Sequence, residues 1–164
     1  MNSNVKAAEG KLGVLVVGLG AVTTTFMTGV LMARKGLAKP VGAMTQYDKV
    51  RVGKGADKKY LKYDEIVPMA KLDDIVFGAW DVYPENAFES AMNCQVLNEK
   101  DILPVKDELE QIVPMKAAFD KNFAKRLEGN NVKECKDRWD MTEQLREDIR
   151  NFKKDLMLGN IFYR

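Results

Sequence analysis

The chain contains no histidine among its 164 residues. For this chain alone, that absence excludes Ser-His-Asp triads, acid–base catalysis by an imidazole and zinc sites with histidine ligands. Only two cysteines are present, Cys94 and Cys135, and they lack CxxC spacing. We therefore expect two reduced thiols in a cytoplasmic protein, without a metal site.

Excess charge of one sign is also lacking, because the formal net charge is only +2. So weak a field gives no reason to expect nucleic acid as a partner. Residues 48–62 are locally basic, and binding of phosphate or nucleic acid is one interpretation of this segment. Aspartates interrupt the basic residues, so we favour a solvated loop.

The longest stretch without charge is residues 12–33, between Lys11 and Arg34. Its length would suit a membrane span or a signal peptide. However, it contains four glycines and four threonines, and its pattern changes midway from a β-branched run to helical spacing. A buried strand followed by a packed helix explains both features, so we expect no membrane partner.

The first half of this stretch, Leu12–Val17, predicts a strand buried on both faces. Gly18, Leu19 and Gly20 then interrupt the strand pattern. The apolar residues that follow at helical spacing are Val22, Phe26, Val30 and Ala33, with Met27 and Leu31 beside them. Gly36 is expected just beyond the end of this helix, and Pro40 prevents its continuation.

The glycines match two positions of the dinucleotide fingerprint G-x-G-x-x-G/A, which lies between a strand and a helix. Gly18 would permit the tight turn, and Gly20 would let a pyrophosphate approach the main chain. Thr23 replaces the third small residue, and Thr23 or Thr24 would offer a hydroxyl to a phosphate at the helix N-terminus. A strand–helix turn that binds nothing is the alternative.

Further strands are predicted over residues 41–45 and 74–80. A helix is expected to open near Pro84, and a short helix within a loop over 98–115. Longer helices are predicted over residues 115–128, with Ala118 and Phe119 facing inward, and over 134–158. Three strands fall short of the six in a complete doubly wound fold. The sequence thus predicts an α/β protein with an incomplete Rossmann-type parallel sheet flanked by helices.

An acidic residue that binds the ribose is expected near the glycine loop. Asp81 ends the predicted strand 74–80, at the edge of the sheet where ligands bind. Asp48 competes with it, because the usual acid lies about 20 residues after the glycines. Asp81 also suits a helix cap or a turn ahead of Pro84. The spacing by itself leaves these alternatives open.

Several features occur together in one known family. They are the Gly-Leu-Gly loop, residues 41–46 (VGAMTQ), 78–82 (GAWDV), 113–116 (VPMK) and 144–153 (QLREDIRNFK). This succession resembles the N-terminal part of inositol-3-phosphate synthases, in particular the Bacteroides-type bacterial branch, over roughly residues 10–154. The family converts glucose 6-phosphate to inositol 3-phosphate with NAD as a recycled hydride carrier. The resemblance therefore implies NAD as cofactor.

The resemblance also implies the site residues. The family's pyrophosphate loop matches Gly18, Leu19, Gly20, Ala21, Val22 and Thr23. Asp81 matches its ribose-contacting acid, in preference to Asp48, and Arg146 matches an arginine that reaches the cofactor. Many relatives have Gly-Asn-Asn where this chain has residues 21–23, so we expect different side-chain contacts there.

The family pattern is not followed after Phe152-Lys153. We expect a flexible segment over 1–11, a partial NAD-binding domain over 12–154, and a divergent end over 155–164 without the family's catalytic domain. No catalytic residue and no metal ligand is assigned. Glucose 6-phosphate and a homotetramer belong to the full-length family, and we expect the chain alone to be inactive. The alternative is a stand-alone nucleotide-binding or protein-interaction module.

Overall fold

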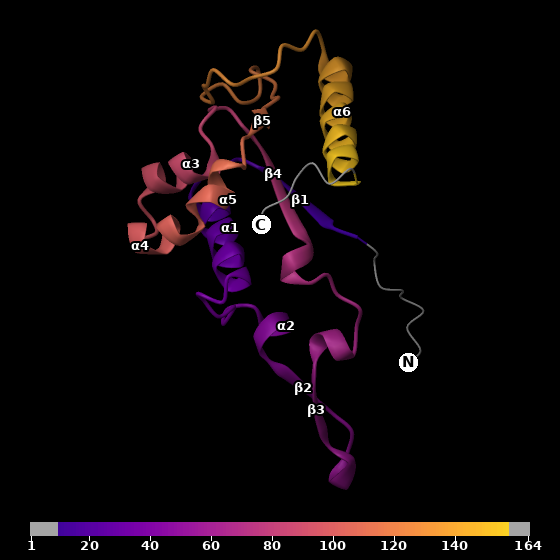
Figure 1. The fold of residues 1–164 in the computed structure, drawn as a ribbon. Helices are drawn as coiled ribbons and strands as arrows, with labels where there is room; N and C mark the ends of the chain where they lie inside the picture. The colour runs from indigo at the N-terminus through magenta and orange to yellow at the C-terminus, as the bar shows by residue number, and fades with distance from the viewer. Residues whose placement is uncertain (1–9, 158–164) are drawn as a thin grey trace.

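The computed structural model describes residues 10–157, which form a parallel sheet with helices on both faces and a separate hairpin (Figure 1). The strands are β1 (Leu12–Val17), β2 (Lys49–Val52), β3 (Lys59–Lys62), β4 (Ile75–Asp81) and β5 (Met115–Lys116). The α-helices are α1 (Ala21–Arg34), α2 (Met44–Tyr47), α3 (Ala87–Cys94), α4 (Glu99–Ile102), α5 (Lys106–Glu110) and α6 (Arg138–Met157). Short 3-10 helices occupy Gly55–Asp57, Tyr63–Glu65, Leu72–Asp74 and Leu103–Val105. The predicted α/β class is confirmed.

The three strands of the sheet run in the order β1-β4-β5. β1 pairs with β4 in parallel along its whole length, from Leu12 opposite Ile75 to Val17 opposite Trp80. β4 is central and buried, whereas β1 is an edge strand that is half-buried or exposed throughout. Burial of β1 on both faces was therefore a wrong expectation. Within residues 10–157, β4 is its only partner strand.

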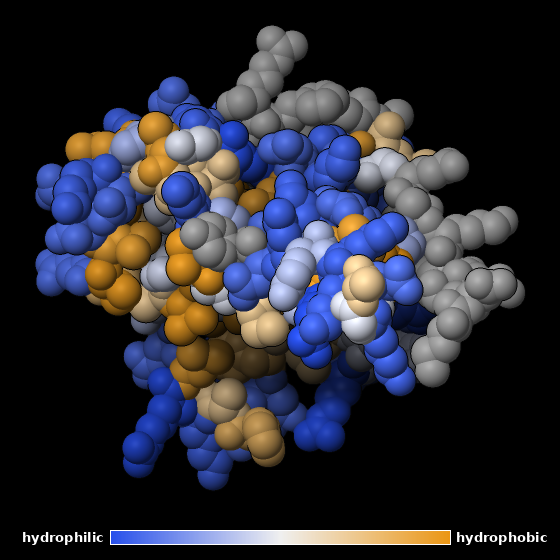
Figure 2. All heavy atoms as spheres, turned by 90° about the horizontal axis from the view of Figure 1, so that it is seen from below, coloured by the Kyte–Doolittle hydropathy of each residue, from blue (hydrophilic) through white to orange (hydrophobic). Residues whose placement is uncertain are grey.

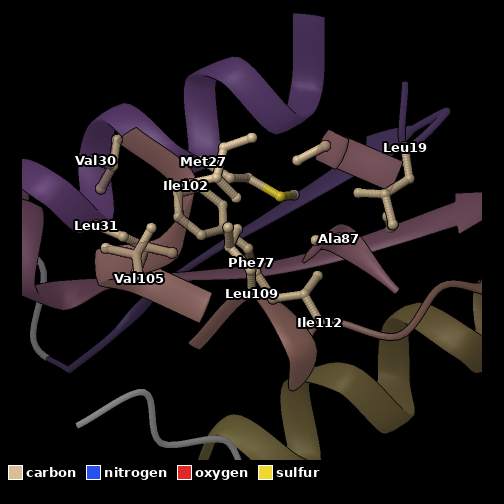
Figure 3. Close-up of a cluster of buried hydrophobic side chains, with 12 residues drawn as sticks. Leu19, Met27, Val30, Leu31, Phe77, Ala87, Ile102, Val105, Leu109 and Ile112 are labelled. Carbon is tan, nitrogen blue, oxygen red and sulfur yellow. The ribbon is translucent and has the colours of Figure 1, made fainter. Parts of the chain in front are cut away.

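One face of the sheet carries a closed core formed with α1, α3, α4 and α5 (Figure 3). Met27 and Phe77 lie at its centre, and their exposed fractions are 0% and 1%. The predicted helix at residues 21–34 is confirmed, but Val22 and Phe26 at its start are 85% and 46% exposed. The buried residues of α1 are Thr24, Met27, Thr28, Val30 and Leu31.

The end of α1 follows its expected chemistry. Gly36 has a φ of +69°, and the Leu37 N–H donates to the Met32 carbonyl at 2.9 Å. A glycine adopts this left-handed conformation without the steric penalty of a Cβ atom. Gly36 is thus confirmed as the residue just beyond the helix.

The opposite face of the sheet is covered by α6 (Figure 1). Phe152 of this helix lies over Gly13 of β1 and Gly78 of β4. A Cβ atom at either glycine would lie 2.7 Å from its ring. No residue of α6 is fully buried, and its large apolar residues Trp139 and Ile149 are 72% and 49% exposed.

Two predicted elements are wrong. Residues 41–45 do not form a strand: the Ala43 N–H bonds to the Pro40 carbonyl in a turn, and α2 follows. Residues 115–128 do not form a helix, because Met115 and Lys116 pair with β4 and Ala117 bonds to Asn131. In both places, turn formation or strand pairing overrides an apolar pattern that is too short to decide the structure by itself.

The segment 48–62 was expected to be a loop and is instead an antiparallel hairpin, β2–β3. It lies at the opposite end of the molecule from the top of α6 (Figure 1). Seen from below, hydrophilic side chains crowd the near part of the molecule, with apolar side chains gathered beside them (Figure 2). In this hairpin, Val50 and Leu61 are half-buried, whereas Val52 and Tyr60 are exposed.

Other predictions fall partly or wholly outside the described part of the chain. The segments 1–11 and 155–164 lie mostly beyond residues 10–157, although α6 continues unbroken through residues 155–157. Both cysteines are free thiols, as expected. Among the described residues, no helix is long and apolar enough to cross a membrane.

Candidate dinucleotide site

The glycine loop leaves the carboxyl end of β1 and is bonded to the end of β4. Gly18 has a φ of +91°, a conformation that a glycine adopts without strain, and its N–H donates to the Trp80 carbonyl at 2.8 Å. Leu19 is 2% exposed and anchors the loop in the core. Its carbonyl accepts a hydrogen bond from the Ser90 hydroxyl on α3. The loop is thus held in position by neighbours on β4 and α3.

Asp81 joins this loop to β4 through its carboxylate. Its Oδ2 accepts a hydrogen bond from the Leu19 N–H at 2.5 Å, and its Oδ1 accepts one from the Tyr83 N–H at 2.9 Å. The second contact is the turn role that the sequence left open. A carboxylate has about four acceptor positions, so both contacts leave capacity for a ribose hydroxyl. The structure therefore brings Asp81 and the glycine loop together.

The N-terminus of α1 points its free N–H groups to the same place. Gly20 is the N-cap residue, and the first turn carries no acidic side chain. A Cβ atom built on Gly18 or Gly20 would meet no atom within 4 Å. An anion therefore has open space beside the loop and no nearby carboxylate from this helix to repel it.

The hydroxyl groups of Thr23 and Thr24 donate hydrogen bonds to main-chain carbonyls. Thr23 Oγ1 donates to the Gly18 carbonyl at 2.8 Å, and Thr24 Oγ1 donates to the Gly20 carbonyl at 3.1 Å. Thr24 is also only 2% exposed. The suggestion that these hydroxyls donate to a phosphate is thus not supported, because their protons already stabilise the turn.

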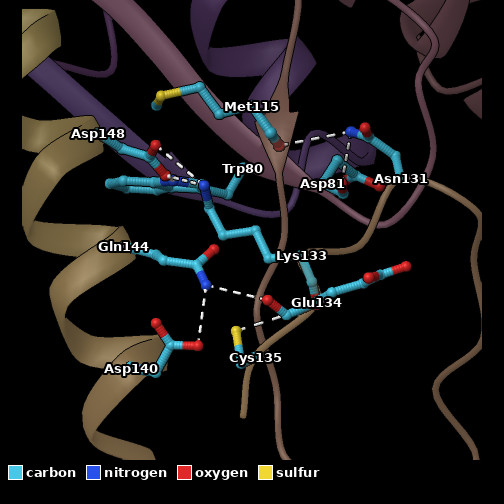
Figure 4. Close-up of polar contacts among 10 residues, drawn as sticks. All are labelled: Trp80, Asp81, Met115, Asn131, Lys133, Glu134, Cys135, Asp140, Gln144 and Asp148. Atoms are coloured by element: carbon cyan, nitrogen blue, oxygen red, sulfur yellow. Dashed lines mark hydrogen bonds and ion pairs between the residues drawn. The ribbon is translucent and has the colours of Figure 1, made fainter.

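Asn131 lies beside Asp81, and Figure 4 shows its side chain directed at this residue. Its amide nitrogen lies 3.0 Å from the Asp81 carbonyl oxygen. Sequence analysis missed Asn131 and Ser90. Asn131 lies in a turn cluster and Ser90 in a short helix, so local pattern did not connect either with residues 50 to 71 positions away.

The two remaining candidates are not bonded to the glycine loop. Arg146 is half exposed on α6 and pairs with Glu143 at 2.6 Å. No hydrogen bond or ion pair joins Arg146 to the glycine loop or to Asp81 in the described region. Asp48 follows α2 beside the hairpin, away from the carboxyl ends of the sheet strands. The geometry therefore favours Asp81 over Asp48.

Beside the site lies a cleft of about 620 Å³. It is lined by Phe119, Asp120, Lys121, Asn122, Val132, Lys133, Glu134, Cys135, Lys136, Asp137, Arg138 and Met141. Burial and the nearby Asp140 raise the pKa of the Cys135 thiol, so it stays protonated at neutral pH. Hydrogen bonds from Arg138 and from the Asn122 N–H lower the pKa of Asp120. These groups are held in neutral or paired forms rather than as a reactive set.

A half-buried ion pair fixes α6 near the same edge (Figure 4). Lys133 lies 3.0 Å from the Asp148 carboxylate, which also accepts a hydrogen bond from Trp80 Nε1 at 2.7 Å. Because Trp80 precedes Asp81, this contact joins α6 to the end of β4.

Taken together, the parallel strands, the glycine turn, the open helix N-terminus and the acid at the end of β4 are the features of a Rossmann-type dinucleotide-binding fold. The NAD-binding family model described as myo-inositol-1-phosphate synthase matches residues 12–162. The chain therefore belongs to this family. The predicted resemblance and the expected cofactor class, NAD, are confirmed at the level of the family.

Individual relatives agree. The chain is 54% identical to inositol-3-phosphate synthase 1 of Bacteroides thetaiotaomicron, over 93% of this chain and 35% of that protein. It is 31% identical to inositol-3-phosphate synthase 1 of Oryza sativa subsp. japonica, over 88% of this chain and 31% of that protein. The chain thus spans about a third of the length of these relatives.

The fold has a solved counterpart in the inositol-3-phosphate synthase of Caenorhabditis elegans. The TM-score is 0.75 at 23% identity, and the match covers 88% of this chain and 32% of that one. At this identity the likeness supports the fold, including the small parallel sheet and its flanking helices.

Proposed function

We propose that the chain binds NAD at the glycine loop. The observation that carries this proposal is the hydrogen bond between the Leu19 N–H and the Asp81 carboxylate, which brings loop and acid together beside an uncharged helix N-terminus. The main chain at Gly18, Leu19, Gly20, Ala21, Val22 and Thr23 would bind the pyrophosphate. Asp81 would accept a ribose hydroxyl, and Arg146 would contact the cofactor from α6.

The wider role that we propose is the cofactor-binding portion of an inositol-3-phosphate synthase acting on glucose 6-phosphate. NAD supplies a hydride acceptor that is regenerated within one turnover of such an enzyme. This chain's residues would bind and orient it, while no catalytic group is assigned to them. A cofactor-binding unit over 12–154, a distinct end over 155–164, assembly into a homotetramer and a cytoplasmic location remain parts of this proposal.

Gly20→Ala tests the site, because the added methyl group enters the open space where the pyrophosphate would lie. Gly20 has ordinary extended angles (φ −94°, ψ −162°), so the fold should tolerate alanine. We expect NAD affinity by calorimetry to fall at least tenfold, with an unchanged melting temperature. Gly29→Ala on α1, which also points into open space, is the matched control and should keep full affinity. Equal affinities for both variants would refute the site.

The edge of the sheet favours protein association as a second candidate function. On β1 and α1, Val17, Val22 and Phe26 are 89%, 85% and 46% exposed. Among residues 10–157, β1 pairs with β4 alone, and an unpaired strand edge readily accepts another strand. Sedimentation measurements separate the two candidates: a compact monomer that binds NAD supports only the first. A concentration-dependent dimer that ignores NAD supports only the second.

A further inference from the structure

Asn131 lies across the carboxyl ends of two neighbouring strands. Its Nδ2 is 3.0 Å from the Asp81 carbonyl oxygen at the end of β4 and 3.4 Å from the Met115 carbonyl oxygen of β5. A third carbonyl, of Tyr83, lies at 3.5 Å. A carboxamide nitrogen carries two donors, so the side chain suits a position that is surrounded by acceptors.

The main chain of Asn131 holds it in this position. Its N–H donates to the Val82 carbonyl at 2.9 Å, and its carbonyl accepts from the Ala117 N–H at 3.0 Å. Nearby, Gly129 packs so closely on Val82 that a Cβ atom would lie 2.3 Å from the Val82 oxygen. The amide is therefore presented to β4 and β5 by a segment that is itself fixed on both sides.

Two hydrogen bonds connect this amide with the glycine loop. The first joins Asn131 Nδ2 to the main chain of Asp81, and the second joins the Asp81 carboxylate to the Leu19 N–H. Any rotation of residue 81 would move its carboxylate away from the loop. An amide that restrains the Asp81 peptide thus also restrains the position of the carboxylate.

We propose that Asn131 is a positioning residue for the dinucleotide site, which acts through Asp81 and not by contact with the reacting atoms. The proposal rests on the proposed NAD binding. In this proposal, the segment 129–133 holds the Asp81 carboxylate beside the glycine loop before NAD binds.

The decisive variant is Asn131→Asp, which keeps the shape of the side chain and replaces its donors by acceptors. At pH 8 the new carboxylate faces three carbonyl oxygens, so we expect NAD to bind about tenfold more weakly, the effect of losing one hydrogen bond. The matched control is Asn130→Asp, an exposed neighbour with the same change of charge. It should bind as the unaltered chain does.

Lowering the pH provides a readout that general loss of stability would not give. Towards pH 5 the new carboxyl group gains protons and with them a hydrogen-bond donor, so the affinity gap between the two variants should narrow. The other ionisable groups on the elements around it are Asp81 at the end of β4, Tyr83 beyond β4, Lys116 on β5 and Lys133 in its own segment. Both variants share them, so the ratio of affinities isolates the new carboxyl group.

Amide hydrogen exchange tests the same inference without NAD. Exchange at Leu19 should be about tenfold faster in Asn131→Asp than in Asn130→Asp at pH 8. Equal exchange and equal affinity in the two variants would overturn the proposal. If Asn131→Asp does not fold, Asn131→Ala is measured against Asn130→Ala by the same criteria. Lack of NAD binding by the unaltered chain would overturn the proposed function alone, since exchange at Leu19 still decides the role of Asn131.

Discussion

The two faces of the sheet are held in different ways. The face under α1, α3 and α5 carries a continuous core in which Met27, Val105 and Leu109 are 0% exposed. The face under α6 contains no fully buried helical residue, and its contacts include Phe152 against two glycines and the Lys133–Asp148–Trp80 network. One face depends on buried apolar area, and the other depends on a few specific contacts.

This difference bears on the candidate site, because the site touches both faces. Leu19 is embedded in the closed core, whereas Trp80, next to Asp81, is bonded to α6. We therefore expect the glycine loop to persist when α6 is disturbed. We expect the position of α6, and with it Arg146, to be more easily changed.

The largest effect is expected from Phe77→Ala in the closed core. Phe77 is 1% exposed and contacts Phe26 edge-on at a ring separation of 5.5 Å. Removing a buried ring of this kind lowers the free energy of unfolding by about 3–5 kcal/mol. Urea denaturation measures the free energy of unfolding. A smaller loss of this free energy than in the α6 variants would contradict the distinction between the two faces.

On the α6 face, Asp148→Asn should lower the free energy of unfolding by about 1.5–3 kcal/mol. The substitution keeps an acceptor for Trp80 but leaves Lys133, only 13% exposed, without its counter-ion. Lys133→Met in the same background shows whether the unpaired ammonium is the cause. The double variant should recover part of the stability, and further loss would point to another mechanism.

A smaller effect, about 1–3 kcal/mol, is expected from Gly78→Ala. The new methyl group would lie 2.7 Å from both Leu15 and the Phe152 ring, so α6 must shift away from the sheet. Hydrogen exchange should rise in α6 and stay unchanged in α1. Gly29→Ala, which meets no neighbour, should instead stabilise α1 slightly. Uniform exchange changes throughout the chain would argue against a separate α6 face.

The smallest effect is expected at the exposed start of α6. The Lys136 N–H and the Gln144 side chain donate hydrogen bonds that lower the pKa of Asp140 below its usual 3.8. A carboxyl group with a lowered pKa in the folded chain stabilises it above the unfolded pKa, and the benefit is lost as the pH falls through the folded value. Asp140→Asn should therefore lower the melting temperature slightly at pH 7 and not at pH 2. An equal loss at both values would exclude the carboxylate charge as the cause.

Sequence reasoning succeeded where the signal is local. The strand–glycine–helix pattern of residues 12–34 and the apolar run of β4 are both found as predicted. It failed where a neighbouring strand determines whether a segment becomes a strand. Residues 41–45 have no strand beside them in the described structure, whereas Met115 and Lys116 pair with β4. The inward side of α1 was ambiguous for a related reason. That helix has no charge before Arg34, so its sequence does not distinguish a core side from an exposed one.

The sequence by itself determined the glycine turn, the uncharged helix after it and the acid that ends β4, since each depends on residues adjacent in the chain. Only the tertiary structure decided that the Asp81 carboxylate accepts a hydrogen bond from the Leu19 N–H and that the Asn131 amide donates one to the Asp81 carbonyl. It also decided that β1 lies at an edge of the described sheet. These contacts join residues 50 to 62 positions apart. Their formation depends on the packing of whole elements, which no local pattern of residue types encodes.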